Sequence, residues 1–253
     1  MINQIQTFNY VHNKQIANSN QTVSFKGINI GNLPEIEVLE GVSPKFVETV
    51  VEAIKSYPAA LTDKIYLYDF KVVLAKEIKD GLEHCKWYTD IKKDNPEYNN
   101  LLGLTYYSGS FPFTESNPNG NFIFLADKVK EASKLVNHEC SHATLLIDKL
   151  ERNQDFQQAV KSDIEELAKK MQQNLLPNQK RLIEQIFLNE NKDEAFREIV
   201  ADTLAWGCPG GGAYGSLLYD KNRDDYLMKK LFPNLISTIN KHYGEKGLVY
   251  TVY

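Results

Sequence analysis

The sequence has few cysteines, no long apolar run and no excess of basic residues, and each absence excludes a class of protein. The three cysteines, Cys85, Cys140 and Cys208, are odd in number and match no paired-cysteine zinc spacing, so we expect free thiols of a reducing compartment. No run of about 18 apolar residues occurs, so no membrane-spanning helix is expected. With 29 basic and 33 acidic residues the net charge is −4, which argues against a broad nucleic-acid-binding surface.

Residues 1–21 are also unlike a secretory signal. They are polar and lack the basic start and the apolar core of such a signal. We therefore expect the protein to be made in the cytoplasm. Delivery outside the cell would then need a specialised secretion system.

The composition is that of a globular protein, with 253 residues, of which 42% are hydrophobic and 25% charged. Ser43 and Pro44 are typical of a helix start, and Pro58 ends the apolar periodicity that follows them. We expect one α+β domain over 1–253, with an α/β lobe at about 1–127 and a mostly helical lobe at about 128–253. The predicted strands are Val23–Ile30, Ile65–Ala75, Leu101–Tyr107 and Asn121–Ala126. The predicted later helices are Lys130–Glu151, Asp155–Gln173, Asn178–Leu188, Asp193–Trp206 and Asp224–Tyr243, the last of them broken near Pro233.

One short motif, HExxH, lies in the first helix predicted for the second lobe. It begins at His138 and ends at His142. Residues four apart on a helix lie about 40° apart around its axis, so both imidazoles point the same way, as two ligands of one zinc ion must. Glu139 lies about 100° from His138, where it can take a proton from an attacking water without ligating the metal. Cys140 points away from His142, so we expect it to be buried.

A catalytic zinc site usually has three protein ligands, so HExxH needs one more. In the helix predicted after residue 192, Glu194, Glu198 and Asp202 recur every four residues. They span about 80° of the helix surface, with Glu198 in the middle. Ala201 and Ala205 share that face, and small side chains let two helices approach closely. We expect this helix to supply the third ligand.

HExxH followed on a later helix by EIVAD, residues 198–202, resembles the gluzincin metallopeptidases, whose second motif is E-x-x-A-D. The resemblance implies a zincin-like fold and one Zn²⁺ per chain, bound by His138, His142 and Glu198. It implies that Asp202 accepts a hydrogen bond from a ligand histidine, which fixes the tautomer and the orientation of the ring. Glu139 would act as the general base and then as the general acid.

The alternative is a register one turn earlier, with Glu194 as the ligand and Glu198 as its partner. The pattern E-x-F-x-E at 194–198 is similar to the anthrax lethal factor-like peptidases and the Pro-Pro endopeptidases, a resemblance that covers about residues 40–206. The chain differs from that group in having Ser141 where the group has glycine. We favour Glu198 as the ligand.

The same group stabilises the developing oxyanion with a tyrosine seven residues before the ligand glutamate, and this sequence has none there. Tyr214 is one replacement, because it lies in the glycine-rich run GCPGGGAYG just after the ligand helix. Tyr106 and Tyr107 are the others.

These resemblances imply a zinc-dependent endopeptidase that acts on a protein or peptide substrate. We expect an extended substrate to pair with Asn121–Ala126 as an edge strand beside the HExxH helix. The small catalytic unit favours a bacterial effector or toxin over a housekeeping peptidase. Two alternatives remain: a non-catalytic zinc- or protein-binding module on the same fold, and a metal-dependent hydrolase of a non-peptide substrate.

Overall fold

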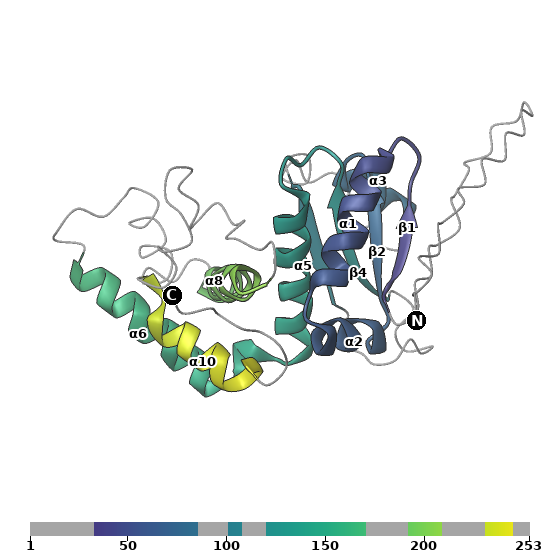
Figure 1. Cartoon of the computed structure of the whole chain (residues 1–253). Helices are drawn as coiled ribbons and strands as arrows, with labels where there is room; N and C mark the ends of the chain where they lie inside the picture. Colours follow the sequence, from purple (N-terminus) through teal and green to yellow (C-terminus); the bar gives the residue numbers. More distant parts are fainter. Residues whose placement is uncertain (1–32, 86–100, 108–119, 171–191, 209–230, 245–253) are drawn as a thin grey trace, which may run out of the picture.

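Four strands form one mixed sheet in the N-terminal part of the chain (Figure 1). The computed structural model describes residues 33–85, 101–107, 120–170, 192–208 and 231–244. The strands are β1 (Glu35–Val38), β2 (Phe70–Ala75), β3 (Gly103–Tyr106) and β4 (Asn121–Ala126), in the order β1-β2-β4-β3. β2 is parallel to β1 and β4, whereas β3 is antiparallel to β4. Among the described strands, β3 is therefore at an edge of this sheet.

β4 is a strand over its predicted residues, but the prediction that it is an edge strand is wrong. It pairs with β2 on one side and with β3 on the other, so it has no free edge for a substrate. All its residues are buried, and a continuous apolar run such as NFIFLA is typical of a strand covered on both faces. The edge beside it belongs to β3, which lies within the predicted strand Leu101–Tyr107.

The strand predicted at Ile65–Ala75 is wrong over its first part. That part belongs to helix α2 (Ala59–Leu67), and β2 begins only after a turn in which Asp69 has a φ of 53°. Leu61 and Ile65 are both buried and lie one helical turn apart, so they give α2 an apolar stripe. β-branched and aromatic composition alone does not distinguish such a short helix from a strand.

Helices cover both faces of the sheet (Figure 1). α1 (Pro44–Ser56), α2 and α5 (Ala132–Ile147) share one hydrophobic cluster, and α3 (Ile78–His84) packs in a second cluster on the opposite face. α1 begins as predicted, because the Ser43 hydroxyl oxygen accepts a hydrogen bond from the backbone N–H of Phe46 at 3.3 Å. It ends before Pro58, also as predicted.

The rest of the described chain is helical, and α8 lies between α5 and the neighbouring helices α6 and α10 (Figure 1). Asp163 of α6 accepts hydrogen bonds from the backbone N–H groups of Asn234 and Leu235 at the start of α10. These helices are η3 (Leu150–Arg152), α6 (Gln154–Lys170), α8 (Lys192–Trp206) and α10 (Pro233–Tyr243). α6 and α8 agree with the predicted helices, and α10 begins at Pro233, where a break was expected. The helix predicted over Lys130–Glu151 ends at Ile147 instead, and η3 follows it as a separate short helix. The predicted strand Val23–Ile30, the predicted helix Asn178–Leu188 and residues 224–230 lie outside the described residues.

The described residues therefore form a mixed α/β structure that is mostly helical and has one small sheet, in agreement with the expected mixed class. Within these residues, no helix combines the length and the apolar character needed to cross a bilayer. The zincin-like arrangement and the single domain over 1–253 stay predictions.

Candidate metal centre

Helix α5 is enclosed by the sheet, by α1 and α2, and by α8, so several of its polar side chains are buried. His138 and Glu139 of the HExxH motif are each only 5% exposed. Buried polar groups need hydrogen bonds or opposite charges, because leaving water without such partners is costly. The partners of these two residues therefore indicate what the motif can do.

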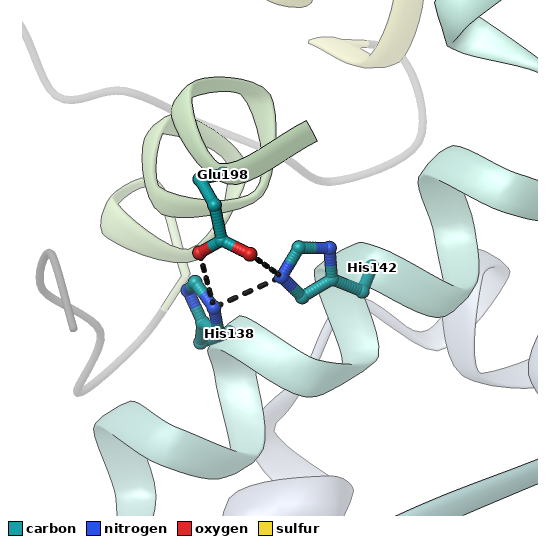
Figure 2. A group of neighbouring side chains, drawn as sticks. All are labelled: His138, His142 and Glu198. Atoms are coloured by element: carbon teal, nitrogen blue, oxygen red, sulfur yellow. Dashed lines mark hydrogen bonds and ion pairs between the residues drawn. The ribbon is translucent and has the colours of Figure 1, made fainter. Parts of the chain in front are cut away.

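Three side chains from α5 and α8 point toward one another in Figure 2. The Nε2 atoms of His138 and His142 are 3.0 Å apart. One Glu198 carboxylate oxygen is 3.4 Å from Nε2 of His138, and the other is 3.2 Å from Nε2 of His142. The structure thus brings together the three residues that the gluzincin resemblance implies as ligands, and this group could hold a metal ion.

The three residues are close enough for one metal ion to reach them all, since one ligand atom of each lies within 4.8 Å of the other two. Zinc–nitrogen and zinc–oxygen bonds of about 2.0–2.1 Å place neighbouring tetrahedral ligand atoms about 3.3 Å apart. The two imidazole nitrogens are 3.0 Å apart, and each has a different Glu198 oxygen at 3.4 or 3.2 Å, so either oxygen could serve as the ligand. Two imidazole nitrogens and one carboxylate also form a donor set that suits zinc.

Asp202 holds the first histidine of the motif. Its carboxylate is fully buried, and it accepts a hydrogen bond of 2.7 Å from Nδ1 of His138. An ionised carboxylate can only accept, so Nδ1 carries a proton and Nε2 is the nitrogen left for a metal. Nε2 faces Glu198 and His142, which is the orientation that a metal ligand requires.

The cluster favours positive charge. Burial alone would lower the pKa of His138, but the carboxylates of Asp202 and Glu198 outweigh it and hold that pKa well above its ordinary value. Burial alone would raise the pKa of Glu198, but the imidazoles of His138 and His142 outweigh it and hold that pKa below its ordinary value. Acceptor atoms that converge in this way are stabilised by a shared proton or by a metal cation.

Comparison with protein-family profiles, with curated proteins and with solved structures found no match to this chain.

Glu139 lies beside the cluster but is not part of it. Its carboxylate accepts a hydrogen bond of 2.7 Å from the hydroxyl of Thr105, a residue of the edge strand β3. Burial raises the pKa of Glu139 above its ordinary value, although His142, His138 and Thr105 act in the opposite direction. A carboxylate with a raised pKa can both take and return a proton near neutral pH.

Sequence reasoning missed Thr105 and its neighbour Gly103. Alternation along β3 was the available signal, because residues 103 and 105 share one face of the strand. Leu104 and Tyr106 pack instead against the cluster on the α3 side of the sheet. Only the position of β3 next to α5 tells which of these faces meets the motif.

The remaining predicted residues are not brought into the cluster by the described structure. Tyr107 stacks on Phe70 at a centroid distance of 5.9 Å, and Tyr106 packs on the far side of the sheet from α5. Tyr214 and the side chain of Glu194 lie outside the described part of the chain, so their predicted roles are untested. Cys140 is buried, as expected.

Proposed function

We propose that this protein is a zinc-dependent endopeptidase of the gluzincin type. The observation that carries the proposal is the convergence of two imidazole nitrogens and a carboxylate from a second helix. A buried glutamate lies next to this group and a buried aspartate holds one of its histidines. A purely structural zinc site more often has a fourth protein ligand, of which the described residues supply none, and has no use for a neighbouring base.

Each residue has a separate role in the proposed reaction. His138, His142 and Glu198 hold the zinc ion, and Asp202 keeps His138 in the correct tautomer and orientation. Bound zinc supplies Lewis acidity, which polarises the scissile carbonyl and acidifies water. Glu139 would accept a proton from the attacking water as the bond from the carbonyl carbon to the water oxygen forms. It would then return that proton to the nitrogen as the carbon–nitrogen bond breaks, which releases a carboxylate and an amine.

The position of β3 at the edge of the sheet is the reason for proposing a peptide as the substrate. Among the described strands β3 pairs with β4 alone, and an extended polypeptide can add to the other edge of such a strand through main-chain hydrogen bonds. Because Thr105 of β3 contacts Glu139, a peptide along this edge would pass close to the proposed base. β3 therefore takes the role that the sequence led us to expect of Asn121–Ala126.

Elemental analysis tests the metal part of the proposal. Protein purified with sufficient zinc should carry close to one zinc per chain. If no transition metal is present, the proposal is wrong at its first step.

Proteomics of newly formed amino termini tests the chemistry. Active protein and a Glu139→Gln variant are each added to a bacterial lysate and to a host-cell lysate. Glutamine keeps the shape of glutamate but cannot accept the proton, so cleavage should fall by at least about a hundredfold while zinc content and thermal stability stay near wild type. Equal sets of amino termini from both proteins would favour the binding module. A full complement of zinc with no cleavage by either protein would favour a non-peptide substrate.

A further inference from the structure

Two residues of β3, Thr105 and Gly103, lie on the face of the strand that meets the HExxH helix. Thr105 presents a hydroxyl and Gly103 presents no side chain at all. The Thr105 hydroxyl oxygen is 2.7 Å from Oε2 of Glu139 and 3.0 Å from the backbone carbonyl oxygen of the same residue. One hydroxyl has one hydrogen to donate, and the ionised carboxylate is the stronger acceptor as well as the nearer one.

Gly103 provides the space that this carboxylate occupies. A Cβ atom on Gly103 would lie 2.7 Å from Cδ and 2.8 Å from Cγ of Glu139, and closer still to Oε1. Separations below about 3.0 Å are essentially never seen for real Cβ atoms, so any side chain at this position must displace either Glu139 or β3. The φ of Gly103 is not positive, so space and not backbone freedom is what this position requires.

We infer that Thr105 and Gly103 are positioning residues for the Glu139 carboxylate, one by holding an oxygen and the other by leaving room for it. This inference rests on the proposed function. A held carboxylate matters because the same group must meet first the proton of the attacking water and then the leaving nitrogen. A misplacement of about 1 Å can cost about a hundredfold in rate.

The central variant is Thr105→Val, which keeps the shape of the side chain and removes the hydroxyl. We expect kcat to fall at least about tenfold, since an untethered carboxylate samples other rotamers, with KM and zinc affinity within about twofold of wild type. Thr105→Ser restores the hydroxyl and should return kcat to within about threefold of wild type. The substrate is a fluorogenic peptide with the cleavage sequence that terminal proteomics identifies.

Gly103→Ala tests the space. The added methyl group should displace the Glu139 carboxylate and lower kcat at least about tenfold with zinc still bound. Two controls make the same kinds of change, threonine to valine and glycine to alanine, at residues away from the centre. Thr62→Val removes a buried hydroxyl that bonds backbone carbonyls of Tyr57 and Pro58, and Gly81→Ala adds a methyl group 2.9 Å from the Phe124 ring. Both controls should change stability and leave kcat unchanged.

Crystal structures of the metal-free and zinc-loaded variants provide a readout besides activity. The Glu139 carboxylate should leave its wild-type position in Thr105→Val and in Gly103→Ala, and should keep it in Thr105→Ser. If Thr105→Val loses stability but keeps wild-type kcat and an unmoved carboxylate, the bond is merely structural and the inference is overturned. If wild type binds no zinc or cleaves nothing, the proposed function fails instead. The position of Glu139 in the metal-free variants then still decides whether β3 holds it.

Discussion

At the scale of single residues, the carboxylates of Glu198 and Asp202 on α8 differ in their exposure to solvent, and this difference separates their roles. The side chain of Asp202 is 0% exposed, whereas that of Glu198 is 31% exposed. A buried carboxylate with its hydrogen bond directed at Nδ1 of His138 can orient that ring but cannot reach a substrate. A partly exposed carboxylate that faces both imidazoles lies where the centre opens toward solvent, as a ligand beside an open coordination position must.

The first prediction concerns the third ligand. Glu198→Ala should lower zinc affinity by more than the roughly 10–100-fold that is typical for the loss of an outer hydrogen-bonding partner, because it removes a ligand atom itself. Glu194→Ala, on the preceding turn, should lower it far less. Competition titration with a zinc-binding dye measures both. A site emptied by Glu194→Ala and kept by Glu198→Ala would show that the earlier register is correct.

The second prediction concerns Asp202. Asp202→Ala should weaken zinc binding about 10–100-fold, because Nδ1 of His138 loses its buried acceptor and the ring loses its orientation. Asp202→Asn keeps an acceptor oxygen but not the charge, so it should cost less. Asp163→Asn is the matched control, since Asp163 is also fully buried and caps α10. It should lower stability without changing zinc affinity, and an equal loss of affinity in both variants would contradict a specific role for Asp202.

At the scale of elements, the centre exists because α8 packs closely against α5. Ile199, Val200 and Leu204 are fully buried and hold α8 in the core on one side. Ala201 and Ala205 are also fully buried and are small, so they allow the carboxylate face of α8 to approach α5. The small side chains of α8 therefore determine the distance between the two helices as much as the three converging side chains do.

The third prediction follows from this packing. Ala201→Leu should push α8 away from α5 and lower zinc affinity, in addition to the roughly 1–3 kcal/mol of stability that overpacking of a core usually costs. Ala159→Leu is the control, because Ala159 is buried in α6 away from the centre. Urea unfolding should show a loss in both variants, and zinc titration should show it in Ala201→Leu alone. Wild-type zinc affinity in Ala201→Leu would mean that the spacing of the helices tolerates a larger residue.

Local signals predict α1, α5, α6 and α8 well because each signal acts within one or two turns, whereas the end of α2 was predicted as a strand and α3 was not predicted. The capping residue Ser43 and the terminating Pro58 mark α1, and the four-residue spacing of HExxH and of the acidic residues shows which side chains share a face. The edge of the sheet is different, because strand order depends on pairings between distant segments. The contact between Thr105 and Glu139 could not be predicted for the same reason, since nothing in the sequence around β3 indicates that Glu139 lies beside it.

At the scale of the whole molecule, the centre connects segments that are far apart in the chain. His138 and Asp202 are separated by 64 residues, and the three side chains that could hold a metal ion come from α5 and α8. Both helices have buried apolar faces of their own, so their association does not depend on the metal. We therefore expect the metal-free protein to be folded and the metal to stabilise it further, unlike a small zinc finger that unfolds without its ion.

The fourth prediction is that zinc raises the melting temperature of chelator-treated protein. A ligand that binds only the folded state stabilises it by about 4 kcal/mol at a free concentration a thousand times its Kd, which corresponds to roughly 10 °C for a protein of this size. Circular dichroism before zinc is added should already show the helical content of the native protein. Mg²⁺ is the control, because it prefers octahedral oxygen ligands and should produce little shift. Since the stabilisation arises from bridging α5 and α8, Glu198→Ala should remove most of the zinc-induced shift while changing the melting temperature of the metal-free protein little. An unchanged shift in Glu198→Ala would place the stabilising zinc somewhere other than between these two helices.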